Sequence, residues 1–249
     1  MKHFLILLVL IMFFGCQSEK KIRIATSANM QFATEELIEE FKKDHDVEFD
    51  LVINSSGNLY AQIKNGAPFD LFIAANQKYP EELFKADLTI EKPKTYAIGK
   101  LILWTSQNIE PSIELLTSDQ IQKIGIANPA TAPYGKQSVN CLKNLGIYEK
   151  VKDKLVYGES ISQTNVFISS GSVDIGFTAL SVVSSPDMKN KGRYIEIEPS
   201  LYTPIQQDVA LLNHSKEKEI CREFYAFLSS ETAQKILLKH GYSVPESKP

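Results

Sequence analysis

Apolar residues along the chain fall into short runs and into helical spacings, and this pattern predicts alternating strands and helices. In the first half, strands are expected at residues 22–25, 47–53 and 70–75. Helices are expected between and after them, because residues such as Met30, Ala33, Leu37 and Phe41 recur at spacings of three and four. Gly66 and Pro68 end the second helix, expected at 59–65, and a third is expected at 79–85. Such a βαβαβα order is typical of a parallel sheet with helices on its faces.

A second unit of the same kind follows. Strands are expected at residues 99–104, 124–127, 155–157, 174–178 and 207–212, and helices at 135–145, 162–170, 217–228 and 232–239. The two halves predict an α/β fold with two lobes and a cleft between them. Ligands of such sheets bind outside the carboxyl ends of the strands.

The first residues have the pattern of an export signal. A basic start precedes an apolar run from Phe4 to Phe14, which is too short for an ordinary membrane-spanning helix. The run stops at Gly15 and Cys16, which resembles a bacterial lipoprotein signal. We therefore expect a signal peptide at residues 1–15, a lipidated Cys16 and a tether at 16–20. The chain would be exported and lipid-anchored at the cell envelope, either periplasmic or on the outer face of the cytoplasmic membrane. An ordinary signal peptide with an incidental Cys16 is the alternative.

Composition and charge narrow the class of ligand. The chain is 43% hydrophobic and 23% charged, which is typical of a globular protein, and its formal net charge is −3. This charge argues against a nucleic-acid partner and indicates that any bound anion is held by local donors. Cys141 and Cys221 lie in helical apolar patterns, which favours two buried thiols over a disulfide. No Cys/His spacing suggests zinc.

Small and polar residues follow four of the predicted strands, at the points where helices begin. They are the loops 26–29 (TSAN), 54–57 (NSSG), 128–135 (NPATAPYG) and 158–161 (GESI). At one loop, helix capping explains such residues. Four helix N-termini facing one cleft are better explained by an anion held by neutral donors, because each exposes unpaired N–H groups and the positive end of a dipole. None of the four loops carries Arg or Lys.

The stretch NGAPFDLFIAANQKY at residues 65–79 is the most diagnostic motif. With the first loop, the Pro133-Tyr134-Gly135 loop, residues 174–177 and the closing His240-Gly241-Tyr242, it resembles the molybdate-binding periplasmic proteins of bacterial molybdenum ABC transporters. The resemblance covers residues 21–242. It implies the two-lobed type II periplasmic-binding-protein fold, with mixed, mostly parallel sheets. One lobe would comprise residues 21–97 and 206–249, and the other residues 98–205.

The resemblance also implies the ligand and its contacts. The oxyanion would be bound by Asn29, by the hydroxyl and N–H of Ser56, and by the backbone N–H groups of Tyr134 and Ile161, with Ala28 and Ser27 as further candidates. Some family members add a tyrosine hydroxyl at a position occupied here by Ala179, and Asn29 would supply the missing donor. Molybdenum would be bound only as its oxyanion, without direct protein ligands and without a cofactor.

The function expected from these features is that of a monomeric solute-binding lipoprotein. It would bind molybdate, and tungstate as well, and deliver it to an ABC permease and its ATPase. Another oxyanion, such as sulfate or phosphate, is the alternative ligand. An enzyme on the same fold is a third possibility, but no set of nucleophile, base and orienting residue is visible in the sequence.

Overall fold

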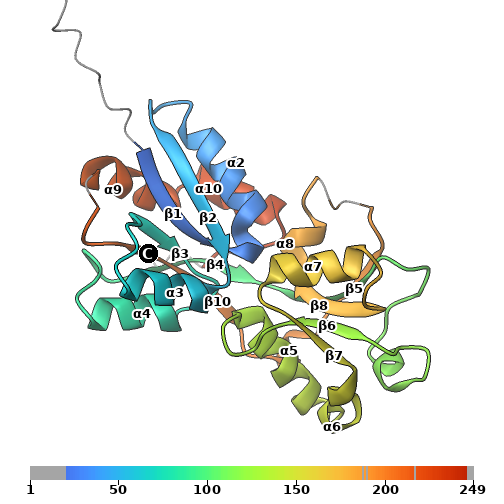
Figure 1. The fold of residues 1–249 in the computed structure, drawn as a ribbon. Helices are drawn as coiled ribbons and strands as arrows, with labels where there is room; N and C mark the ends of the chain where they lie inside the picture. The colour runs from blue at the N-terminus through green and yellow to red at the C-terminus, as the bar shows by residue number, and fades with distance from the viewer. Residues whose placement is uncertain (1–20, 187, 189, 216, 246–249) are drawn as a thin grey trace, which may run out of the picture.

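The chain folds into two five-stranded sheets, each covered by helices (Figure 1). The computed structural model describes residues 21–186, 188, 190–215 and 217–245. The expected signal peptide, the tether and Cys16 lie outside these residues. In the described part, no helix is both long and apolar enough to cross a membrane. The predicted α/β class with two sheets is confirmed.

The first sheet has the strand order β2-β1-β3-β10-β4, and the second has the order β7-β6-β8-β5-β9. We call each sheet with its helices a lobe. The strands are β1 Lys21–Ser27, β2 Glu48–Asn54, β3 Leu71–Ile73, β4 Lys94–Gly99, β5 Leu101–Thr105, β6 Ile124–Ala127, β7 Leu155–Gly158, β8 Ile175–Ala179, β9 Arg193–Glu196 and β10 Ile205–Leu211.

Nine α-helical segments and four short 3₁₀ turns connect the described strands. The α-helices are α2 Gln31–Phe41, α3 Ser56–Lys64, α4 Lys78–Lys85, α5 Pro133–Asn144, α6 Tyr148–Val151, α7 Ile161–Ser169, α8 Leu180–Val183, α9 Lys218–Phe227 and α10 Glu231–Lys239. The 3₁₀ turns are η1 Ala28–Met30, η2 Glu114–Thr117, η3 Lys152–Lys154 and η4 Pro199–Leu201.

One strand in each sheet runs against the other four. In the first sheet β10 is antiparallel to β3 and β4, and in the second β5 is antiparallel to β8 and β9. Each antiparallel strand is the first that the chain forms after crossing between the sheets: β5 follows β4 of the first sheet, and β10 follows β9 of the second. The chain crosses once at Lys100, between β4 and β5, and returns between β9 and β10. The two lobes are therefore joined by two adjacent crossings, an arrangement that permits hinge motion.

Apolar side chains fill both faces of each sheet. In the first lobe, α2, α9 and α10 cover one face through residues such as Phe41 and Phe224, and α3 and α4 cover the other through Leu59 and Leu83. In the second lobe, α5 contributes to the largest cluster, which also includes Ala28 and Ala75 from the first lobe. The two lobes therefore share apolar contact where their strand ends meet.

Most predicted elements are present, and the differences have local causes. The strand expected at 99–104 corresponds to β5, and the chain turns at Lys100 just before it; the preceding strand β4, Lys94–Gly99, was missed. The edge strand β9 was missed, because its residues RYIE are mostly exposed and polar and have no apolar signal. Cys141 and Cys221 are free and buried in different apolar clusters, which confirms the prediction of two thiols.

Candidate anion-binding site

Four helical segments begin where four parallel strands end, and their N-termini meet at the boundary between the lobes. β1 leads into η1 and β2 into α3 in the first lobe, whereas β6 leads to α5 and β7 to α7 in the second. Two contacts bring the sets together: α7 packs against η1, and the N–H of Gly57 donates to the carbonyl of Thr131, which precedes α5, at 2.8 Å. The convergence expected from the sequence is present.

Ser56 is the first residue of α3 and is fully buried. Its hydroxyl oxygen accepts a hydrogen bond from the N–H of Ala75 at 2.9 Å, so its own proton is available to a ligand. The N-cap is the preceding residue, Ser55, whose side chain accepts from Asn58 N–H at 3.4 Å. Helix capping and ligand binding therefore fall to different serines. Ser55 caps the helix, and Ser56 keeps a hydroxyl proton that can be donated to an anion.

Asn29 lies in η1 and is buried, but its amide is already bonded. Its Nδ2 donates to Oε1 of Gln207 at 2.9 Å and to the hydroxyl of Tyr242 at 3.0 Å. The hydroxyl of Tyr242 gives its single proton to the backbone oxygen of Asn29, at 2.7 Å, and so accepts from the amide. Both amide protons are therefore used within the protein. This corrects the expectation that the Asn29 side chain supplies a donor, and leaves its backbone N–H for that role.

Tyr134 and Ile161 offer backbone donors from the second lobe. Tyr134 follows Pro133 at the start of α5, and Ile161 is the first residue of α7. Neither N–H has a hydrogen-bond partner among the described residues, as is usual in the first turn of a helix. Ser160 caps α7, its side chain accepting from Gln163 N–H at 3.4 Å. Both predicted residues are buried and stand at helix N-termini, where an anion is favoured.

The further candidates differ in what they can donate. Ser27 donates its hydroxyl proton to the carbonyl of Ile73 at 3.0 Å, so its side chain is bonded to the neighbouring strand. Ala28 is buried at the start of η1 and has only its backbone N–H to offer. Ala179 ends β8 and its side chain has no donor, as noted from the sequence. Asp70 accepts from Arg23 N–H at 2.8 Å, a bond within the first sheet.

Sequence reasoning missed Gln207, a fully buried residue of β10 that joins both lobes. Its Oε1 accepts from Asn29 and from the hydroxyl of Tyr96, at 3.3 Å, and its Nε2 donates to the hydroxyl of Tyr134, at 3.2 Å. Burial raises the pKa of Tyr96 and of Tyr134 well above the usual value, so the network stays uncharged. β10 has the sequence IQQDVAL, in which Gln206 and Asp208 flank Gln207, so no local signal in the sequence distinguishes the buried glutamine from its polar neighbours.

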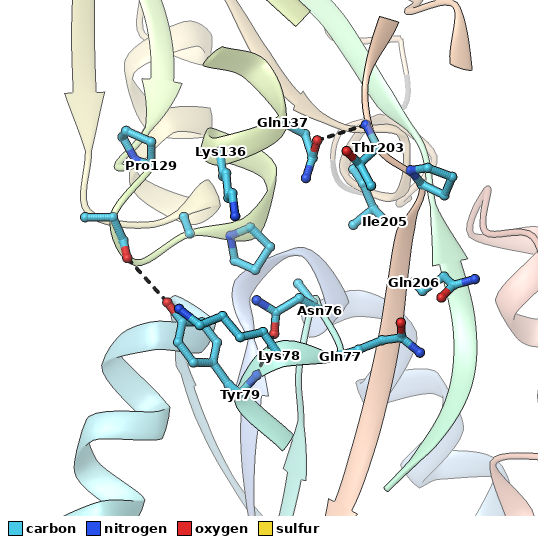
Figure 2. A pocket seen from close by; sticks show the side chains of 15 residues that line it. Asn76, Gln77, Lys78, Tyr79, Pro129, Lys136, Gln137, Thr203, Ile205 and Gln206 are labelled. Atoms are coloured by element: carbon cyan, nitrogen blue, oxygen red, sulfur yellow. Dashed lines mark hydrogen bonds between the residues drawn. The ribbon is translucent and has the colours of Figure 1, made fainter. Parts of the chain in front are cut away.

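Two glycines permit the close approach of the lobes. A Cβ on Gly99 would lie 1.9 Å from the hydroxyl of Tyr134 and 2.5 Å from Nε2 of Gln207. A Cβ on Gly57 would lie 2.8 Å from Cα of Thr131 and 2.9 Å from its carbonyl oxygen. Beside Gly57, the hydroxyl of Tyr79 donates to the carbonyl of Ala130 at 3.3 Å (Figure 2). The lobes are thus closed on each other by direct hydrogen bonds.

The chemistry of this arrangement suits an anion without protons. The donors that face the site are uncharged N–H groups and one hydroxyl, set at the positive ends of helices. In the described part of the chain, no group of three or more His, Cys, Asp or Glu is placed to hold a metal ion. A site of this kind stabilises negative oxygens, and it offers nothing to accept a proton from a protonated one.

Comparisons with known proteins agree with this fold. The chain is 33% identical over 227 residues to the molybdate-binding protein ModA of Azotobacter vinelandii, covering 90% of each chain. It is 35% identical over 190 residues to ModA of Rhodobacter capsulatus, covering 75% of this chain and 74% of that one. The solved structure of the Azotobacter vinelandii periplasmic molybdate-binding protein superposes with a TM-score of 0.85, covering 90% of this chain and all of that one at 30% identity.

A family described as "Bacterial extracellular solute-binding protein" matches residues 22–243, nearly the whole described part of the chain. The match spans both sheets, both crossings and all four converging helix N-termini. The chain therefore belongs to the family of bacterial extracellular solute-binding proteins.

Proposed function

We propose that this protein binds molybdate, and tungstate as well, in the cleft between its lobes. The observation that carries the proposal is the convergence of four helix N-termini that present uncharged donors and the free hydroxyl proton of Ser56. Relatives at 33% and 35% identity are named for binding molybdate, which supports the same ligand here.

The donor set accounts for binding without a counter-ion. Hydrogen bonds to a charged partner contribute about 1.5–3 kcal/mol each. Six of them would give a gross stabilisation of about 10 kcal/mol, from which the desolvation of the ion is subtracted. The donors are the backbone N–H groups of Asn29, Tyr134 and Ile161, the N–H and hydroxyl of Ser56, and the N–H of Ala28. Because none can accept a proton, protonated phosphate is disfavoured, and sulfate is distinguished by its smaller size.

The test is a calorimetric titration panel with molybdate, tungstate, sulfate and phosphate under identical conditions. We expect tight binding of molybdate and tungstate and much weaker binding of the other two. Tight binding of sulfate or phosphate together with no binding of molybdate or tungstate would overturn the proposal. That outcome would instead support the alternative oxyanion receptor.

We further propose that the protein is held at the cell envelope by a lipid on Cys16 and delivers its ligand to an ABC permease and its ATPase. The support is the sequence pattern around Gly15 and Cys16 together with the family. Two lipid chains would make a firm anchor, where one chain alone is marginal. A Cys16→Ser variant should leave the membrane fraction and fail to incorporate labelled fatty acid. Retention of both properties would contradict the anchor.

A further inference from the structure

A cavity of about 380 Å³ lies between the lobes, beside the candidate site (Figure 2). Its lining comes from three places: the segment 75–79 of the first lobe, the segment 129–137 of the second, and the returning crossing at 203–206. The hydrogen bond from Tyr79 to Ala130 closes part of its edge. The lining mixes polar and apolar side chains, and two lysines belong to it, Lys78 at the start of α4 and Lys136 in the first turn of α5.

The cavity lies directly next to the donor cluster, because the same short segments of chain contribute to both. Ala75 lines the cavity, and its N–H bonds the hydroxyl oxygen of Ser56. Ala132 and Pro133 line it from the other lobe and directly precede Tyr134, whose N–H is a donor. An anion in this cavity would therefore lie next to the place where the closed lobes would hold it.

The lysines bring positive charge to a region whose donors are neutral. Lys136 is exposed, and no carboxylate of the described residues lies within salt-bridge distance of it. Lys78 is exposed, and its ammonium lies 3.8 Å from a carboxylate oxygen of Glu82, an exposed pair that neutralises it only weakly. The chain as a whole has a formal net charge of −3, which repels a dianion. Local cations at the cleft would counter this repulsion.

We infer that this cavity is a second, weaker anion site beside the donor cluster, in which Lys78 and Lys136 attract the incoming dianion. The inference rests on the proposed function, because the anion is the one that the donor cluster binds. Charges outside the final site raise the association rate and leave the dissociation rate nearly unchanged. Their effect fades as salt shortens the range of the interaction.

The test compares two double variants of equal charge. Lys78→Gln with Lys136→Gln removes the cavity lysines, and Lys85→Gln with Lys143→Gln removes a lysine from each of the same helices, α4 and α5, away from the cavity. Molybdate association and dissociation are followed by rapid mixing, and the dissociation constant by calorimetry. At an ionic strength of about 0.01 M, we expect the cavity pair to slow association roughly three- to tenfold and the control pair to have little effect.

At an ionic strength of about 1 M, where the Debye length is about 3 Å, the cavity variant and the unchanged protein should associate at equal rates. A variant with Lys136→Arg should keep the fast rate, because it keeps the charge. Equal slowing by the cavity pair and the control pair, or no slowing by either, would overturn the inference while leaving molybdate binding intact. If the unchanged protein does not bind molybdate at all, the proposed function fails instead, so the two failures are distinguishable.

Discussion

Gln207 of β10 donates a hydrogen bond of 3.2 Å to the hydroxyl of Tyr134 on α5, and this bond joins the first lobe to the second. The same Gln207 side chain accepts from Asn29. Gln207, which lies beside a crossing, therefore connects two segments that carry predicted donors: η1 with Asn29 in the first lobe and the start of α5 with Tyr134 in the second. The first prediction follows from this bond.

Tyr134→Phe should destabilise the protein and weaken molybdate binding only modestly. The substitution leaves Nε2 of Gln207 buried without an acceptor, which costs about 1–3 kcal/mol, whereas the backbone N–H of residue 134 is unchanged. Chemical denaturation and calorimetry measure the two effects. Tyr157→Phe, on an exposed side chain of β7, is the matched control. A loss of affinity as large as that of a ligand-contacting residue would show that the hydroxyl itself contacts the anion.

Ser56→Ala should weaken molybdate binding by roughly ten- to a hundredfold, the equivalent of about 1.5–3 kcal/mol for a hydrogen bond to a charged ligand. Ser55→Ala is the natural control, because it removes the neighbouring N-cap and should cost about 1 kcal/mol of stability with little loss of affinity. Calorimetry and thermal unfolding of both variants separate the two roles. Equal affinity losses at the two positions would contradict the assignment of Ser56 as the donor.

Substitution of Asn29 should lower both ligand affinity and stability, because its side chain makes two buried hydrogen bonds within the protein. Asn29→Ala removes the partner of both Gln207 and Tyr242, and we expect binding to fall at least tenfold, about 1.4 kcal/mol, together with a loss of stability. Asn29→Asp should be worse, since it places a carboxylate against two acceptors and beside the anion. Calorimetry for affinity and thermal unfolding for stability, measured on the same variants, distinguish a structural role of this side chain from direct contact with the ligand. A loss of affinity with unchanged stability would indicate that the side chain serves the ligand directly.

Gly57→Ala should hinder the closure of the two lobes without preventing the protein from folding. Gly57 is in the first turn of α3, and an added Cβ would lie 2.8 Å from Cα of Thr131 in the other lobe. We expect affinity to fall roughly tenfold or more, about 1.4 kcal/mol, because fewer molecules reach the closed arrangement. Stability without ligand should be unchanged or higher, since alanine favours a helix over glycine. Small-angle scattering with molybdate should show a more open molecule, and full closure of the variant would contradict this account.

Asp208 should make stability depend on pH. Its burial raises the pKa of the carboxyl above the ordinary value of 3.8, against the opposing hydrogen bonds from Thr95 and Gln77. The folded state then holds the proton more tightly than the unfolded state does. The resulting stabilisation is present below pH 3.8 and is lost as the pH rises through the folded-state pKa.

Asp208→Asn keeps an oxygen for Thr95 and carries no charge. We expect this variant to unfold at a higher temperature than the unchanged protein at neutral pH, with the difference vanishing in acid. Thermal unfolding across the acid-to-neutral range measures this, with Asp153→Asn on an exposed residue as the control. A variant that is less stable at neutral pH would show that the carboxylate charge itself holds β10 in place.

Local patterns were sufficient to predict most of the strands, though not β4 or β9, together with the main helices and the four converging N-termini. Periodicity locates a helix start, and capping residues such as Ser55 and Ser160 confirm where N–H groups are left unpaired. The side-chain partners could not be predicted, because they join residues distant along the chain. Asn29 meets Gln207 and Tyr242 only once both sheets have formed, and nothing near Asn29 in the sequence distinguishes a saturated amide from a free one.

The two free thiols have a consequence for how an exported chain reaches its fold. Cys141 lies on α5 and Cys221 on α9, in the cores of different lobes, and burial raises the pKa of each thiol to about 11. Once folded, both are protected from oxidants, because the thiolate is the reactive form. Before folding, both are exposed, and a disulfide between them would hold the lobes in a non-native arrangement. In an oxidising compartment, burial of each thiol in its own core on folding thus prevents this non-native disulfide.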